Sequence, residues 1–337
     1  MFSKFARGLS AETAFDVLAV AKRLKAKGKD VIELQIGDSP YPSTKSAIKT
    51  GIDSIQRGST HYCPSPGLPE FRQTIAENYQ KEFGVKIGPE NVVIGSGAKV
   101  FEQFFCEAFL DAGDAVLLFS PQFPTYEPNI LRRNARPVYS TLKQQNQFRP
   151  DLNDVENFVK KESNAKAIFL NSPHNPTGGV ASVSDLRAIA DIIRGRQIAL
   201  FSDEPYCHMV WKGKHQTILA EPGMMGQCVA AYTFSKSYSM SGWRLGYAVG
   251  DKSVIETVSK MINTSLSCVP PFVQLAGQAA IQNDDAERNE VMARFRKKVE
   301  FPAEAIDGVA DEQYLRNVVD VLYRTRTETR AEKMVAA

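Results

Sequence analysis

Several short apolar runs in the middle of the chain are each followed directly by residues that could do chemistry. Lys236 follows one of them, in Thr233-Phe234-Ser235-Lys236, and Asp203 and Tyr206 follow another, in Ser202-Asp203-Glu204-Pro205-Tyr206. A buried lysine would have a lowered pKa, which makes its amine a nucleophile. A buried carboxylate needs a cationic partner, either a protonated ring nitrogen or a structural arginine. A lone lysine is more often on the surface, so this interpretation depends on the whole set of residues.

A glycine-rich turn, Gly95-Ser96-Gly97-Ala98-Lys99, follows the apolar run that ends at Ile94. Such a turn before a helix presents backbone N–H groups and the positive end of the helix to an anion. A phosphate site and a turn needed only for packing are both open. Arg244 could add a two-pronged phosphate contact. A dinucleotide site is rejected, because Val100 takes the last glycine position and the next run, ending at Phe119-Ser120, lacks the acidic residue that would hold a ribose.

Two proline-containing loops follow two further runs. The prolines of Ser120–Tyr126 hold Phe123 where it could stack on a flat ligand, although a phenylalanine is more often a core residue. In Asn171–Gly178, Asn175 precedes a proline and is therefore held extended. Its amide could donate to a ligand oxygen, or it could serve only in an Asx-type turn.

The elements that carry these residues alternate between about residues 90 and 250. Apolar runs rich in β-branched residues are separated by helical or loop stretches, which favours an α/β layered domain with a mostly parallel sheet. Ligands bind such sheets at the carboxyl ends of the strands, where the polar residues lie. The predicted strands are Asn91–Ile94, Ala115–Phe119, Ala167–Leu170, Ile198–Phe201, Val229–Tyr232 and Leu245–Val249.

Helical patterns flank this region. Residues 10–27 are predicted to be a helix, residues 31–36 to be extended, and residues 253–300 to be helices broken at Pro270-Pro271. Beyond Phe301 one more amphipathic segment begins at about Asp311. Its apolar stripe consists of Leu315, Val318, Val319 and Leu322.

The composition excludes several classes of protein. The chain has 337 residues, enough for roughly two domains. With 41 Lys and Arg against 38 Asp and Glu, the net charge of +3 gives no case for a nucleic-acid or membrane partner. No apolar stretch approaches the roughly 20 residues of a membrane helix, and no secretory signal is recognised. The 5 cysteines are scattered and lack C-x-x-C spacing, so we expect a cytoplasmic protein with reduced thiols. The 4 histidines show no H-x-x-x-H spacing, so we expect no metal site.

Taken together and in this order, the motifs resemble the fold-type I pyridoxal-phosphate enzymes, specifically the class I and II aminotransferases. The resemblance runs from about Gly37 to about Pro271. Its most specific parts are Asn175-Pro176-Thr177-Gly178, Asp203-Glu204-x-Tyr206, Ser235-Lys236 with Gly242–Tyr247, and Tyr62–Phe71. It implies a large domain whose mostly parallel sheet is sandwiched by helices, together with a small domain.

The resemblance implies a role for each matching residue at the cofactor ring. Lys236 would carry pyridoxal phosphate as a Schiff base and later move a proton between the substrate and the cofactor. Asp203 would pair with the pyridinium nitrogen and keep it protonated. Asn175 and Tyr206 would bond the phenolic oxygen, and Phe123 would stack on the ring.

The resemblance also implies residues for the phosphate, the substrate and a second subunit. Tyr62 would reach the phosphate of a neighbouring subunit, which implies a homodimer. Gly37 and Asn175 would lie beside the substrate carboxylate. The phosphate of the same subunit would be held by Gly97, Ala98, Lys99, Thr233, Ser235 and Arg244.

The end of the chain departs from the family pattern. The small domain normally contributes strands and an Arg-x-Ser-like motif that grips the substrate carboxylate, and no such motif is found here. We therefore expect an N-terminal arm over residues 1–45, a large domain over 46–275 and a reduced helical small domain over 276–337. The predicted function is amino-group transfer between an amino acid and a 2-oxo acid. The alternatives are another pyridoxal-phosphate reaction, such as a C–S lyase or a decarboxylase, and a non-catalytic protein of the same fold.

Overall fold

The computed structural model describes residues 1–2, 4–9, 13–33 and 35–306. The chain divides into two compact units, Met1–Asn289 and Glu290–Ala337. The predicted amphipathic segment from Asp311 lies outside the described residues. The expected division into residues 1–45, 46–275 and 276–337 stays a prediction.

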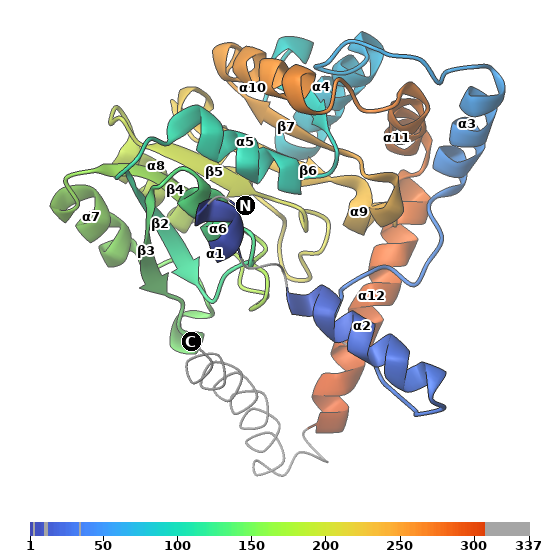
Figure 1. Cartoon of the computed structure of the whole chain (residues 1–337), viewed down its shortest axis with the longest axis horizontal. Coiled ribbons are helices and arrows are strands. Elements are labelled where there is room, and N and C mark those ends of the chain that lie inside the picture. Colours follow the sequence, from blue (N-terminus) through green and yellow to red (C-terminus); the bar gives the residue numbers. More distant parts are fainter. Residues whose placement is uncertain (3, 10–12, 34, 307–337) are drawn as a thin grey trace. The chain divides into compact units, whose positions relative to one another are not determined.

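The first unit contains a seven-stranded sheet in the order β1-β7-β6-β5-β4-β2-β3 (Figure 1). Strands β6, β5, β4, β2 and β3 are parallel, whereas β7 is antiparallel to both of its neighbours. This confirms the predicted α/β fold with a mostly parallel sheet. The strands are β1 (Val92–Gly95), β2 (Ala115–Ser120), β3 (Arg136–Thr141), β4 (Ala165–Asn171), β5 (Ala199–Asp203), β6 (Cys228–Thr233) and β7 (Gly246–Gly250).

Strand β3 is absent from the sequence prediction. It pairs only with β2, so it forms one edge of the sheet, and most of its residues are not fully buried. Tyr139 remains 49% exposed. An edge strand needs few apolar residues, and Pro137 makes the pattern harder to recognise.

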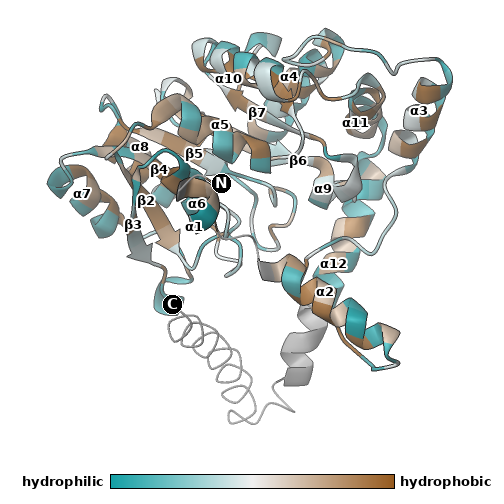
Figure 2. Ribbon diagram, viewed as in Figure 1, coloured by the Kyte–Doolittle hydropathy of each residue, from teal (hydrophilic) through white to brown (hydrophobic). Residues whose placement is uncertain are grey.

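Helices cover both faces of the sheet, because successive strand side chains point to opposite sides. Val116 and Leu118 of β2 belong to one buried cluster and Leu117 and Phe119 to the other. The hydropathy colouring shows β2 as a hydrophobic strand (Figure 2). One face packs against α5 (Lys99–Phe109), α6 (Tyr126–Arg132) and α10 (Lys252–Ser265), and the other against α4 (Pro69–Phe83), α7 (Leu152–Lys161), α8 (Val183–Ile193) and α11 (Pro271–Asn283).

The remaining helices agree with the sequence patterns where they can be compared. Helix α2 (Thr13–Ala26) matches the predicted N-terminal helix, and α11 begins at Pro271, at the predicted break. The described part of residues 31–36 forms no strand and no helix. No helix of the described residues is apolar over enough turns to cross a membrane. The other helices are α1 (Lys4–Gly8), α3 (Lys45–Gln56), α9 (Phe234–Ser237) and α12 (Asp285–Ile306).

Candidate active site

The carboxyl ends of β4, β5 and β6 bring the predicted residues to one edge of the sheet. Asn171 pairs in register with Asp203, and Thr233 at the end of β6 pairs with Gly246. Gly246 also pairs with Gly95 at the end of β1. Because β7 is antiparallel, its first residue lies at this edge, and the glycine-rich turn and the Lys236 segment become neighbours.

Asp203 is buried at the end of β5. Its Oδ2 accepts a hydrogen bond from the Tyr126 hydroxyl at 2.5 Å. Burial raises the pKa of Asp203 to about 7, with Glu204 adding to the rise and the Tyr126 hydrogen bond opposing it. No arginine or lysine of the described residues forms an ion pair with Asp203, so a structural arginine is not its partner. The site instead offers a carboxylate that a ring cation could pair with.

The side chains of Asn171 and Asn175, at the end of β4 and in the loop after it, make different hydrogen bonds. Asn171 Oδ1 accepts from the backbone N–H of Asn175 at 2.7 Å, so the local turn is closed by the side chain of Asn171. The amide of Asn175 is left to donate to the Tyr206 hydroxyl at 3.2 Å. The Asn171 bond spans four residues, whereas an Asx turn spans two, so it is not an Asx turn. Asn175 and Tyr206, predicted to bond one oxygen together, lie within contact of each other.

Lys236 lies on the short helix α9, whose first N–H groups are capped by Thr233. The Thr233 Oγ1 accepts from the Ser235 N–H at 3.1 Å. Lys236 Nζ donates to the Gly37 carbonyl oxygen at 2.7 Å, and it lies 5.8 Å from the centre of the Tyr206 ring. The structure thus places the predicted nucleophile beside Gly37 and Tyr206, although the three are far apart in sequence.

The glycine-rich turn and Arg244 form a tight cradle. Arg244 Nη2 donates to the Ser96 carbonyl oxygen at 2.9 Å. Gly97 has φ +87, and a Cβ there would lie 2.5 Å from Arg244 Nη2. A Cβ on Gly246 would lie 2.7 Å from the Gly97 carbonyl carbon. Only glycine lets the turn, the start of β7 and the guanidinium approach so closely.

The cradle opens into a cleft of about 460 Å³. Lys99 is exposed at this cleft, with its Nζ 5.1 Å from the centre of the half-buried Phe123 ring. The hydroxyl of Thr233 donates to the Ser235 Oγ at 2.8 Å, so two predicted phosphate donors adjoin each other. The cleft is lined by Leu9, Ser96, Lys99, Val100, Gln103, Pro124, Thr125, Pro128, Asn129 and Arg244.

Tyr62 is not brought into this cluster within one chain, since it is 90% exposed. Three residues that hold the site were not predicted: Tyr126, Asn171 and Gly246. Both Tyr126 and Asn171 stand inside the two segments that the sequence singled out. Asn171 ends β4, which was the available signal, whereas Tyr126 begins α6, six residues after the end of β2. No group of three or more His, Cys, Asp or Glu side chains in the described ranges is arranged to hold a metal.

The donor set fits pyridoxal phosphate. A phosphate matches the guanidinium of Arg244 and the hydroxyls and N–H groups around Gly97. A pyridinium nitrogen matches Asp203, a phenolic oxygen matches Asn175 and Tyr206, and an aldehyde carbon matches the amine of Lys236. Every functional group of that cofactor therefore has a complementary side chain on one edge of the sheet.

Comparison with known proteins agrees with this geometry. The family model for aminotransferase class I and II matches residues 29–307. The aspartate aminotransferase of Pyrococcus horikoshii is 34% identical over 77% of this chain and 66% of that protein. A probable aspartate/prephenate aminotransferase of Aquifex aeolicus is 34% identical over 87% of this chain and 75% of that protein. This chain thus spans about two thirds to three quarters of the length of these relatives.

Solved structures show the same fold. The aspartate aminotransferase of Thermus thermophilus with maleate superimposes with a TM-score of 0.87 at 26% identity, covering 91% of this chain and 80% of that one. The Thermotoga maritima aspartate aminotransferase gives a TM-score of 0.85 at 29% identity, with coverage of 91% and 80%. The predicted fold, enzyme class and cofactor class are confirmed: the chain belongs to the class I and II aminotransferase family of pyridoxal-phosphate-dependent transaminases.

Proposed function

We propose that this protein transfers an amino group between an amino acid and a 2-oxo acid, with pyridoxal phosphate bound covalently through Lys236. The observation that carries the proposal is the position of Lys236 Nζ. It lies 2.7 Å from the Gly37 carbonyl oxygen and beside the Tyr206 ring, at the sheet edge where Asp203 is buried. When bound, pyridoxal phosphate would supply an electron-withdrawing ring that stabilises negative charge at the substrate α-carbon.

Lys236 has two tasks in this proposal. Its amine first holds the cofactor, and once an amino acid has displaced it, the free amine takes the proton from the substrate α-carbon. The Gly37 carbonyl orients that amine by accepting its hydrogen bond. Since both tasks need the same nitrogen at the same place, a fixed position of the α9 turn is required for each of them.

Asp203 and Tyr126 would control the charge of the ring nitrogen. An ionised Asp203 keeps that nitrogen protonated, and Tyr126 favours the ionised carboxylate by donating to Oδ2. Asn175 and Tyr206 would donate to the phenolic oxygen and stabilise its anion. Arg244, with the hydroxyls of Thr233 and Ser235 and the turn at Gly97, Ala98 and Lys99, would bind the phosphate.

The names of the relatives support aspartate as the first donor to test, because the P. horikoshii and T. maritima proteins are named aspartate aminotransferases.

We also propose a homodimer in which the exposed Tyr62 reaches the phosphate site of its partner. The five free cysteines are consistent with a cytoplasmic location.

An absorbance experiment tests the activity. We expect the purified protein with pyridoxal phosphate to show a band near the visible edge that Lys236→Ala lacks. Aspartate should convert the band to the pyridoxamine form, and a 2-oxo acid should restore it. Release of ammonia, thiol or carbon dioxide without that cycle would instead favour a lyase or a decarboxylase, and a protein that binds no cofactor would contradict every catalytic interpretation.

A further inference from the structure

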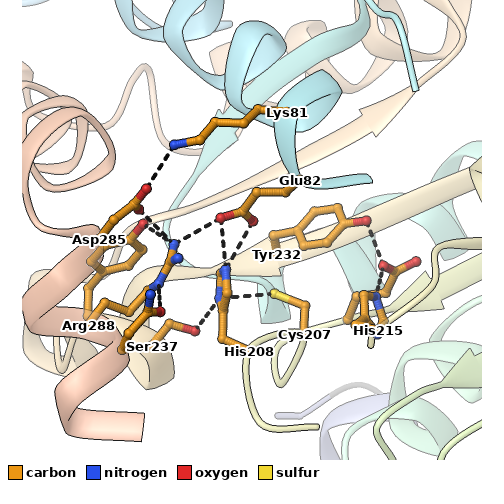
Figure 3. A network of polar contacts seen from close by, with 12 residues as sticks. Lys81, Glu82, Cys207, His208, His215, Tyr232, Ser237, Asp285 and Arg288 are labelled. Carbon is orange, nitrogen blue, oxygen red and sulfur yellow. Dashed lines mark hydrogen bonds and ion pairs between the residues drawn. The ribbon is translucent and has the colours of Figure 1, made fainter. Parts of the chain in front are cut away.

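A closed ring of hydrogen bonds adjoins Lys236, and much of it is seen in Figure 3. Ser237 Oγ contacts His208 Nδ1 at 2.8 Å, and His208 Nε2 contacts the Glu82 carboxylate at 3.0 Å. Glu82 accepts from Arg288 Nη1 at 2.9 Å, and the same nitrogen donates to the Tyr238 hydroxyl at 3.0 Å. The peptide bond between Ser237 and Tyr238 completes the circuit, which we call the Glu82 ring.

The Glu82 ring joins segments that are distant in sequence. Glu82 lies in the last turn of α4, His208 in the turn after β5, and Arg288 in the first turns of α12. The two ends of the ring are placed next to the chemistry. Ser237 directly follows Lys236, and His208 lies two residues after Tyr206. The Ser237–His208 hydrogen bond therefore connects the segment that carries Lys236 to the segment that carries Tyr206.

The charges of the ring stabilise one another. Burial alone would raise the pKa of Glu82. The hydrogen bonds and the positive charges of His208 and Arg288 lower this pKa to about 2. Burial alone would lower the pKa of His208, but the Cys207 and Glu82 side chains raise it to about 10. Nε2 faces the Glu82 carboxylate, and Nδ1 contacts both the Ser237 Oγ at 2.8 Å and the Cys207 Sγ at 3.4 Å. His208 therefore acts as a rigid two-ended spacer.

A second buried serine hydroxyl serves as a comparison. Ser140 Oγ donates to Asp154 Oδ2 at 2.7 Å, and Ser140 is fully buried. Ser140 lies on the edge strand β3. No hydrogen bond of Ser140 or Asp154 reaches Ser237 or Tyr238 in the described residues. Loss of the Ser140 hydroxyl should therefore weaken the fold without moving the α9 turn.

We propose that Glu82, His208 and Arg288 are positioning residues that hold Lys236 Nζ in register with the Tyr206 hydroxyl. The inference rests on the proposed function, since it assigns the ring a role only through the attachment and proton transfer at Lys236. Small displacements of a reacting group cost rate, with about 1 Å costing about 100-fold.

Ser237→Ala tests the link most cleanly, because it removes one hydroxyl and leaves the Glu82–Arg288 pair intact. Two quantities are measured: the rate at which added pyridoxal phosphate attaches to Lys236 in the apoprotein, followed by absorbance, and kcat and KM for transamination. We expect attachment and kcat to fall by about 10- to 100-fold, with KM within about threefold. His208→Gln should give a similar loss, and the double variant should add little, because both remove one link.

Ser140→Ala is the matched control, because it makes the same substitution at another buried hydroxyl. This variant should lower the melting temperature while leaving the attachment rate and kcat within about twofold of wild type. If Ser237→Ala behaves in the same way, the positioning role is overturned. If the wild-type protein attaches the cofactor but transfers no amino group, the proposed function fails, while the attachment rates still decide the role of the ring.

Discussion

The Tyr126 hydroxyl donates a 2.5 Å hydrogen bond to the Asp203 carboxylate, and both side chains are buried. Asp203 Oδ2 thus accepts from a neutral donor on α6, while burial disfavours the ionised form of Asp203 and raises its pKa. The carboxylate is stabilised by the phenol and still requires a cation. This relationship leads to two of the predictions below.

Tyr126→Phe should shift the acid limb of the pH profile to higher pH. The Tyr126 bond lowers the pKa of Asp203, so its loss raises that pKa and leaves less of the ionised carboxylate at neutral pH. We expect kcat/KM at pH 7 to fall by about tenfold, with partial recovery at higher pH. Tyr139→Phe is the control, because Tyr139 lies on the edge strand β3. An unchanged acid limb in Tyr126→Phe would contradict the assignment.

Asp203→Asn should abolish transamination and stabilise the apoprotein above neutral pH. The folded-state pKa of about 7 is higher than the ordinary value of 3.8, so the folded state binds this proton more tightly. The stability from Asp203 is therefore present at low pH and is lost as the pH rises from about 4 through 7. The neutral amide avoids that loss, by up to about 4 kcal/mol. Denaturant unfolding of the two apoproteins at pH 5 and pH 8 measures it. Equal stabilities at pH 8 would show that the carboxylate is not penalised.

Glu82→Gln should destabilise the protein most at neutral pH. The pKa of Glu82 is lowered from 4.5 to about 2, so its contribution is present above about pH 4.5 and is lost as the pH falls through 2. We expect a loss of about 3 kcal/mol at pH 6 that shrinks toward pH 3. Thermal unfolding across this range gives the difference. A loss independent of pH would mean that packing, and not charge, dominates at this residue.

Gly97→Ala should weaken cofactor binding more than it weakens the fold. The new Cβ would lie 2.5 Å from Arg244 Nη2 and push the guanidinium out of the cradle. Gly113→Ala is a matched control, since Gly113 has the same φ of +87 with open space around it. Both variants should lose about 1 kcal/mol of stability from the left-handed backbone. Only Gly97→Ala should raise the Kd for pyridoxal phosphate, by about tenfold or more. Equal affinities in the two variants would argue against the cradle.

The sequence was most informative where one residue type decides both structure and chemistry. The alternation of apolar runs predicted the mostly parallel sheet. Asp203 ends β5 and Lys236 follows β6, the neighbouring strand, so both lie at the carboxyl ends of strands. Strand β3 was missed because an edge strand leaves little apolar signal. The Glu82 ring could not be predicted, because its partners come from α4, α9 and α12 and meet only once the helices pack. Asn175 shows a third limit: its side chain fitted a local turn or a contact at the site, and only the fold shows that its amide donates to Tyr206 while Asn171 bonds the backbone of the loop.

The reversed direction of β7 has a consequence for the way a cofactor would be held. Strand β6 ends at Thr233 and β7 begins at Gly246, and these two residues are paired with each other. Everything between them is one short connection, anchored to the sheet at both ends, which carries Lys236 near its start and Arg244 near its end. The attachment point for the aldehyde and a principal contact for the phosphate therefore belong to a single closed loop of chain. The distance between the two side chains is therefore set within one segment of chain, whose two ends are paired residues of the sheet.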